Sequence, residues 1–324
     1  MSYAEHLREW YGLPVFDFPG PEDEGNDKAD DLPAADAVAW RISTDTYDAE
    51  ESWPEALARF AATVDTTRVR AIVVGAVEEA YDGDAGLKPV YGALLDARAE
   101  LPSLRALFLG DMESEECEIS WINQADVGPL LHAFPDLEEF GVRGASGLEF
   151  PAVSHRRLRT LVVESGGMPA DAVRGIAASD LPALEHLDLW LGISDYGGDS
   201  ELGDLAPILD GARLPRLRHL ALRNCEYQDE IATAVASAPV VARLETLDLS
   251  MGVLTDDGAT ALLDGQPLTH LKRLDLHHHY ISGPLQQRIR ETLEPAGVRL
   301  DLDKDNAEED EYDGRTWRYV AVGE

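Results

Sequence analysis

The sequence is poor in features that define several common classes of protein. It has two cysteines, Cys117 and Cys225, in 324 residues, too few for a disulfide framework, which suits a reducing compartment. No apolar run approaches the roughly 18 residues that a membrane span needs. The N-terminus also lacks the cationic start and apolar core of a signal peptide. These absences predict a cytoplasmic protein with no membrane partner.

Basic residues are scarce as well. There are 27 lysine and arginine residues against 62 aspartate and glutamate residues, and the formal net charge is −35. Such a charge repels nucleic-acid phosphates, so no nucleic-acid partner is expected, and a basic protein or peptide is favoured instead. Arginine greatly exceeds lysine, and alanine, aspartate and valine are frequent. We interpret this composition as that of a high-GC or salt-adapted bacterial source.

Motifs of common enzymes are missing from the sequence. It contains no GxSxG, GxxxxGK[ST], HExxH, CxxC or GxGxxG pattern, which would signal an esterase nucleophile, a phosphate loop, a zinc protease, a redox pair or a dinucleotide site. We therefore expect no enzyme activity, no catalytic residues and no cofactor.

One pattern, apolar-x-x-Leu-x-x-Leu-x-Leu with conservative replacements, recurs seven times along the chain. The copies are LPSLRALFLGD (101–111), FPDLEEFGVRG (134–144), HRRLRTLVVES (155–165), LPALEHLDLWL (181–191), LPRLRHLALRN (214–224), VARLETLDLSM (241–251) and LTHLKRLDLHH (268–278). Weaker copies occur at 67–76 and 296–304. Repeats of this length indicate a solenoid, in which each unit buries the apolar face of its neighbour.

The repeats resemble the leucine-rich repeat family, specifically the longer ribonuclease-inhibitor-like type in which a helix follows each strand. The best match is LETLDLSMGVLTDDGATALLDGQPLTHLKRLDL, and the resemblance covers residues 67–302. It implies an α/β solenoid of about nine strands, with a curved parallel sheet inside and helices outside. At about 4.8 Å per strand the sheet would span about 40 Å.

The spacing between repeats is uneven, from 21 to 35 residues between successive inward positions. In the longer steps we expect a longer loop after the strand, followed by a helix. Such loops lie on one rim of a solenoid, where binding residues often occur. The 21-residue step from Phe140 to Leu161 leaves no room for a helix, so we expect an extended connection there.

The two ends of the chain lie outside the repeat. Residues 1–66 should form an N-terminal capping region with an acidic loop at 19–36, a strand at 37–43 and a helix at 52–64 with Ser52 as its cap. Residues 303–324 should form an acidic C-terminal tail or cap, with Trp317 and Tyr319 available to cover the last repeat.

The candidate ligand-binding residues face outward from the sheet, because alternate side chains of a strand point to opposite faces. An aromatic side chain beside arginine, histidine and acids is typical of a protein-binding surface. The candidates are Glu139, Arg143, Glu164, His186, Asp188, Trp190, His219, Arg223, Asp248, Arg273, Asp275 and His277.

Three consecutive histidines, His277, His278 and His279, raise the question of a metal site. Neighbouring strand residues diverge, so the three cannot bind one ion together. His186 and His219 occupy matching positions on consecutive strands, so a metal-assisted hydrolase using these two and nearby carboxylates is an alternative. Zinc takes three or four well-aimed ligands, and the pattern supplies two, so we expect no metal.

The favoured function is a non-catalytic protein-protein interaction module. It would be a monomer that holds a protein or peptide ligand, of basic character, on the concave sheet face and the rim loops.

Overall fold

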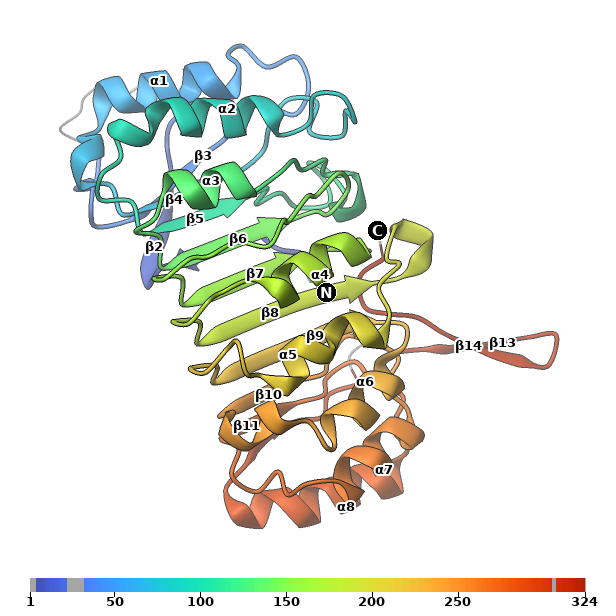
Figure 1. Cartoon of the computed structure of the whole chain (residues 1–324). Coiled ribbons are helices and arrows are strands. Elements are labelled where there is room, and N and C mark those ends of the chain that lie inside the picture. The colour runs from blue at the N-terminus through green and yellow to red at the C-terminus, as the bar shows by residue number, and fades with distance from the viewer. Residues whose placement is uncertain (1–3, 22–31, 305–306, 324) are drawn as a thin grey trace.

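A twelve-stranded sheet runs through the molecule, and its strands follow one another in chain order (Figure 1). The computed structural model describes residues 4–21, 32–304 and 307–323. β1 pairs antiparallel with β2, and every later neighbour pairs in parallel. The strands are β1 (Glu9–Trp10), β2 (Leu13–Asp17), β3 (Ala39–Ile42), β4 (Ala71–Val74), β5 (Ala106–Leu109), β6 (Glu139–Arg143), β7 (Thr160–Glu164), β8 (His186–Gly192), β9 (His219–Cys225), β10 (Thr246–Asp248), β11 (Arg273–Asp275) and β12 (Arg299–Asp301).

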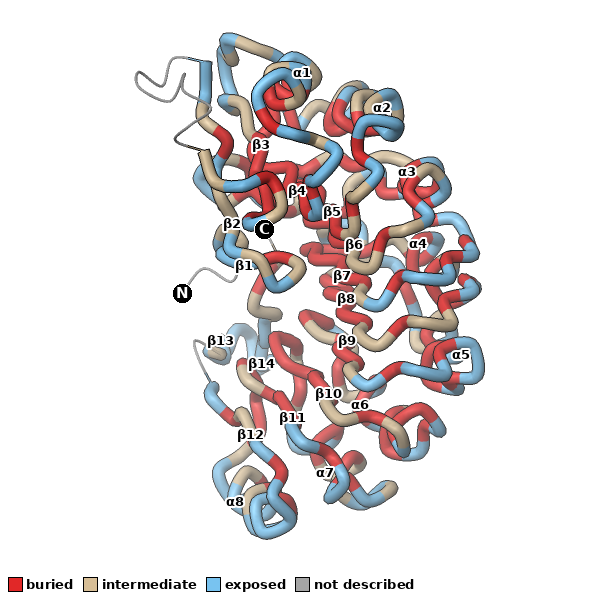
Figure 2. Tube along the Cα trace, turned by 90° about the vertical axis from the view of Figure 1, so that its left-hand side faces the viewer, coloured by how far each residue is buried: buried red, intermediate tan, exposed pale blue. Residues whose placement is uncertain are grey.

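Helices cover the convex face of this sheet, and Figure 2 shows the curve that results. They are α1 (Trp53–Thr63), α2 (Lys88–Asp96), α3 (Gly128–Ala133), α4 (Ala170–Ala178), α5 (Ala206–Asp210), α6 (Gln228–Val235), α7 (Asp256–Asp264) and α8 (Gly283–Leu293). Short 3₁₀ helices occupy Thr66–Arg68, Ala97–Ala99, Ile119–Trp121, Ser194–Tyr196, Leu202–Leu205, Pro239–Arg243 and Glu294–Ala296. The α/β solenoid predicted from the repeats is therefore confirmed.

The inward residues of the repeats stack in register along the sheet. Each member of the series pairs directly with the next, in the order Ile72, Leu107, Phe140, Leu161, Leu187, Leu220, Leu247, Leu274 and Leu300. All but Leu300 are at most 1 % exposed. Burial of a leucine contributes about 1.5–3 kcal/mol, so this column accounts for much of the stability of the core.

The sheet begins before the first clear repeat. β3 places Trp40 opposite Ile72, and β2 places Phe16 opposite Trp40. Aromatic side chains thus continue the inward column where the leucine pattern is absent. The nine strands β4 to β12 lie within residues 67–302, while the division of the chain into cap, solenoid and tail stays a prediction.

Two local expectations are met in the connections. Helix α1 follows Ser52, whose backbone N–H donates to the Glu55 carboxylate at 2.8 Å, and Pro54 lies in its first turn. The connection from β6 to β7, residues 144–159, contains no helix. Among the described residues, no helix is long and apolar enough to cross a membrane.

The C-terminal region forms a two-stranded hairpin, β13 (Glu309–Tyr312) and β14 (Arg315–Arg318), which projects from the solenoid (Figure 1). Trp317 is 49 % exposed on this hairpin. The chain then turns back toward the middle of the sheet instead of covering the last repeat.

Candidate functional site

The concave face is bordered by segments from both ends of the chain. Figure 2 shows the helices on one side of the sheet, with β1 and the β13–β14 hairpin on the other. The N-terminal segment (residues 4–11) lies over the first strands, where Trp10 packs edge-on against Phe108 with ring centroids 5.2 Å apart. These rings join Val73 and Val162 in an apolar cluster on this face.

Buried charges hold the N-terminal segment in place. Asp111, which is fully buried, accepts a hydrogen bond from the backbone N–H of Leu7 at 3.0 Å and pairs with Arg41 at 2.8 Å. It also pairs with Arg143 at 3.2 Å. Burial raises the pKa of Asp111, but the contact with His6 and the charges of Arg143 and Arg41 outweigh that effect and hold the pKa below its usual range.

Two of the predicted ligand-binding residues belong to this internal network. Arg143 is 2 % exposed, donates to the Glu5 carbonyl at 2.9 Å and pairs with Glu164 at 2.7 Å. Glu164 is buried beside it. Glu139 lies apart from them on β6, where burial raises its pKa against an opposing hydrogen bond from the Tyr11 backbone. Arg143 and Glu164 therefore bind the chain itself.

The C-terminal segment (residues 319–323) lies against the central strands. The Asn224 side chain donates to the Val322 carbonyl at 2.6 Å and accepts from the Val322 N–H at 2.9 Å. The Ala321 N–H donates to the Met251 carbonyl at 2.8 Å. Trp190, the aromatic residue among the predicted ligand-binding residues, is 3 % exposed because it packs in a cluster with Val322 and Met251.

A polar surface remains on β8 to β11, beside these covered parts. Arg223 donates two hydrogen bonds to the Asp188 carboxylate, at 3.0 and 2.6 Å, and lies 3.7 Å from Asp248. Its guanidinium also lies 5.0 Å from the centre of the Trp190 ring. Burial and the charge of Asp275 raise the pKa of Asp248 against the opposing charge of Arg223. The two hydrogen bonds to Asp188 and the contact with the Trp190 ring hold the Arg223 side chain in one orientation.

His186 and His219 form a stacked pair on β8 and β9. Their ring centroids are 3.8 Å apart and the rings are nearly parallel, at 7°. Burial lowers the pKa of His186 to about 4, with a further contribution from His219. Burial also lowers the pKa of His219 to about 4, with contributions from Arg223 and Arg273. Both imidazoles are therefore neutral at pH 7.

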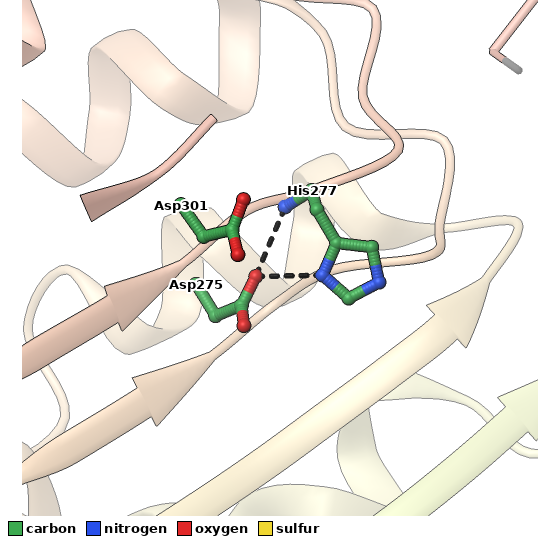
Figure 3. Close-up of side chains that lie close together, drawn as sticks. All are labelled: Asp275, His277 and Asp301. Atoms are coloured by element: carbon green, nitrogen blue, oxygen red, sulfur yellow. Dashed lines mark hydrogen bonds and ion pairs between the residues drawn. The ribbon is translucent and has the colours of Figure 1, made fainter. Parts of the chain in front are cut away.

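The three consecutive histidines point to three different partners. The His277 Nδ1 lies 2.7 Å from an Asp275 oxygen (Figure 3). The His278 Nε2 lies 3.0 Å from the Tyr319 carbonyl. His279 is fully buried and accepts a hydrogen bond from the Ile281 N–H at its Nδ1. The expectation that they cannot bind one ion together agrees with this geometry.

Within the described residues, one group of three possible metal ligands comes together, and it is Asp275, His277 and Asp301 (Figure 3). Their ligand atoms lie within 4.8 Å of one another. Asp275 already accepts a 2.6 Å hydrogen bond from Arg273, so a cation would compete with a charged partner. His186 and His219 are not part of this group, and their stacked rings do not aim two lone pairs at a common point.

The predicted residues thus fall into separate sets. Asp188, Trp190, Arg223 and Asp248 form one contact network on β8 to β10. Arg273, Asp275 and His277 form another at β11.

Sequence reasoning missed the residues that attach the chain ends, chiefly Asp111, Arg41 and Asn224. Asp111 and Asn224 are the last residues of their repeat copies, 101–111 and 214–224, but nothing in the repeat pattern distinguishes either position.

The chain is similar to a curated protein and to a solved structure, and no family model matches it. The chain is 29 % identical over 132 residues to a putative F-box/LRR-repeat protein 23 from Arabidopsis thaliana, a match that covers 39 % of this chain and 28 % of that protein. The chain therefore matches less than a third of that relative's length. A solved structure of a Bacteroides fragilis protein superposes with a TM-score of 0.74 at 27 % identity, over 84 % of this chain and 73 % of that one.

Proposed function

We propose that this chain, which folds as a leucine-rich repeat solenoid and is similar over part of its length to a putative F-box/LRR-repeat protein, is a non-catalytic module for protein-protein interaction. It binds a protein or peptide ligand on the accessible part of its concave face and on the rim loops. The observation that carries this proposal is the polar surface on β8 to β11, where Arg223, Asp275 and His277 are oriented by hydrogen bonds.

Such fixed side chains are suited to recognition. A group that is already held in one rotamer loses less conformational entropy when a ligand binds. The half-buried His186 and His219 and the exposed Arg273 extend this surface toward solvent. Together they offer imidazole faces and the guanidinium groups of Arg223 and Arg273 to a ligand, and the buried carboxylates of Asp188 and Asp275 hold those guanidinium groups in place.

The charge of the molecule favours one kind of partner. A net charge of −35 attracts a basic protein and repels nucleic acid and anionic membrane. We propose a cytoplasmic monomer on the same grounds of composition. A metal-assisted hydrolase has weaker support, because the two histidines it requires are stacked and the Asp275 carboxylate is occupied by Arg273.

The proposal is tested by affinity capture with the full chain as bait. The bait variant carries His219→Gln and Arg273→Gln on the concave face. The matched control carries His132→Gln and Arg288→Gln on α3 and α8 of the convex face. A ligand of the concave face should be retained by wild type and control and lost by the concave variant.

The captured protein is then purified and its affinity is measured directly. We expect at least a tenfold weaker Kd for the concave variant, which corresponds to about 1.4 kcal/mol. Equal affinity of all three proteins would contradict a concave binding site. Stoichiometric metal in the purified protein, together with hydrolytic activity lost in His219→Gln, would contradict a non-catalytic role.

A further inference from the structure

Exposed aromatic side chains gather at one place on the rim of the solenoid. Among the described residues, the exposed large aromatics fall into two groups, one on the β13–β14 hairpin region and one on the rim loops. The rim group consists of Tyr47 at 65 %, Tyr81 at 43 % and Trp121 at 55 % exposure. Clustered exposed aromatics mark interaction sites more often than single ones do.

These three side chains line one cavity of about 460 Å³. The rings of Tyr47 and Tyr81 have centroids 6.0 Å apart and are tilted by 36°. The remaining lining residues are Ser114, Glu115, Glu116, Cys117 and Glu118. We call Tyr47, Tyr81, Trp121, Glu115, Glu116 and Glu118 the rim patch.

The loops that carry the rim patch are tied to one another. They follow β3, β4 and β5, three consecutive strands. The Glu79 N–H donates to the Thr46 carbonyl at 3.3 Å. The Asn123 side chain donates to the carbonyls of Tyr81 and Trp121 at 2.8 and 3.1 Å. The three aromatic residues are therefore positioned by hydrogen bonds between loops that are far apart in sequence.

Two residues of these loops have unusual backbone conformations. Asp48, next to Tyr47, has φ +51°, and Glu79, two residues before Tyr81, has φ +54°. Non-glycine residues adopt this left-handed region at an energetic cost and tend to occur at functional sites. Each of these residues lies within two positions of one of the two tyrosines.

The rim patch carries negative charge with no basic side chain among its lining residues. Glu115 and Glu118 are exposed. A neighbouring cavity of about 570 Å³ shares Glu116 and adds further carboxylates, those of Asp45, Asp48, Glu50 and Glu51. Glu51 pairs with Arg59, and Glu116 lies 3.3 Å from a ring nitrogen of His6. Aromatic faces beside carboxylates attract a cation, since both the ring quadrupole and the charges favour it.

Thiol chemistry does not account for this cavity. Burial raises the pKa of Cys117 to about 11, and the charges of Glu118 and Glu116 add to the effect. The thiolate needed for a nucleophile is therefore scarce at pH 7.

We propose that the rim patch binds an arginine-containing, extended segment of a partner protein. One guanidinium lies against Tyr47, Tyr81 and Trp121, and neighbouring arginines pair with Glu115 and Glu118. Arginine fits better than lysine because its planar cation stacks on aromatic rings. This inference rests on the proposed function, since it names the partner class that such a module would bind.

The test uses a fluorescein-labelled nonapeptide of alternating glycine and arginine, with the full chain at about 0.15 M salt, where long-range attraction is screened. A second peptide carries citrulline in place of arginine, which keeps the shape and removes the charge. Fluorescence anisotropy should show binding of the arginine peptide and at least tenfold weaker binding of the citrulline peptide.

Matched variants separate the rim patch from general charge attraction. Tyr47→Ser/Trp121→Ser is compared with Tyr312→Ser/Trp317→Ser, which removes the same residue types from the hairpin. Glu115→Gln/Glu118→Gln is compared with Glu100→Gln/Glu311→Gln, which removes the same charge elsewhere. We expect each rim variant to bind the arginine peptide at least tenfold more weakly and each control to stay within twofold of wild type.

Two outcomes would overturn the inference. One is no binding of the arginine peptide, and the other is equal loss in rim and control variants. Circular dichroism of each variant checks that folding is unchanged, as expected for exposed side chains. The concave-face capture experiment tests different residues. A partner lost by the concave variant would therefore support the proposed protein-binding function even if the rim patch does not bind the arginine peptide. If neither the concave variant nor the rim variants lost binding, both the proposed function and the arginine-binding inference would be contradicted.

Discussion

At the scale of single residues, the polar groups of the concave face divide into those that attach the chain ends and those that remain accessible to a ligand. Asp111 and Arg143 bind the N-terminal segment, and removal of one member of a buried pair typically costs about 3–5 kcal/mol. His186, His219 and Arg273 instead retain access to solvent. Substitutions at the first group should therefore affect folding, and substitutions at the second should affect binding.

The stacked histidines predict a pH dependence of stability. Their pKa of about 4 in the folded state lies below the value of about 6.5 in an unfolded chain. Between these pH values the unfolded chain binds more protons, so the free energy of unfolding decreases as pH falls from about 6.5 to 4. Asp188, Arg223, Arg273 and Asp275 are the charged groups that influence the pair.

His186→Gln/His219→Gln should flatten this dependence. We expect the loss of unfolding free energy between about pH 6.5 and 4.5 to be smaller than in wild type by about 1–3 kcal/mol, allowing for partial solvent screening. Urea denaturation across this range measures it, and NMR titration of the wild type gives each pKa. Parallel curves for the two proteins would contradict the assignment.

At the scale of elements, the short connection between β6 and β7 lets α4 approach it closely. A Cβ atom built on Gly175 of α4 would lie 1.7 Å from the Phe150 carbonyl oxygen. Glycine is thus required there by the close approach of two backbones. Gly92 of α2 has no atom within 4 Å of the corresponding position.

These two glycines make a matched pair for mutation. Gly175→Ala should destabilise the protein by about 1–3 kcal/mol through overpacking. Gly92→Ala should stabilise it by up to about 1 kcal/mol, because alanine favours the helix. Thermal and urea unfolding measure both, and similar effects of the two substitutions would show that α4 does not pack as described.

Asn224 makes two of the hydrogen bonds that hold the C-terminal segment. Asn224 has φ +53°, so Asn224→Gly removes the side chain without straining the backbone. The loss of both hydrogen bonds to Val322 should destabilise the segment by about 1–3 kcal/mol and expose Trp190. Hydrogen exchange at the Val322 amide and Trp190 fluorescence report this release.

Ser120→Ala serves as the control for that experiment, since Ser120 donates one hydrogen bond to the Gly323 carbonyl. It should release the segment less than Asn224→Gly does. If the Val322 amide exchanged as slowly in Asn224→Gly as in the wild type, the apolar contacts with Ile119 and Met251 would be sufficient to hold the segment in place.

At the scale of the whole molecule, net charge should govern stability as well as association. A charge of −35 produces self-repulsion that favours expansion, and salt screens it. We expect the unfolding temperature at pH 7 to rise between about 20 mM and 0.5 M sodium chloride. Near pH 4.4, the sequence pI, the same series should show little change. A decrease with salt at pH 7 would mean that attractive ion pairs dominate.

The sequence by itself determined the solenoid, because repeated local patterns impose the same strand and turn wherever they occur. The repeat pattern predicted that neighbouring units bury each other's apolar faces, and the 21-residue step predicted the connection without a helix after Phe140. It also identified which residues face outward, since alternation along a strand is a local property. The sequence did not predict which of these outward-facing residues are exposed to solvent.

Only the tertiary structure decided which outward residues remain available. Trp190 and Arg143 face outward from their strands, as His219 and Arg273 do. Chain ends that are distant in sequence nevertheless cover Trp190 and Arg143. The rim patch likewise joins three loops whose aromatic residues follow no period. Contacts of this kind depend on single long-range hydrogen bonds and on individual side-chain packing, and a repeating pattern carries no information about either.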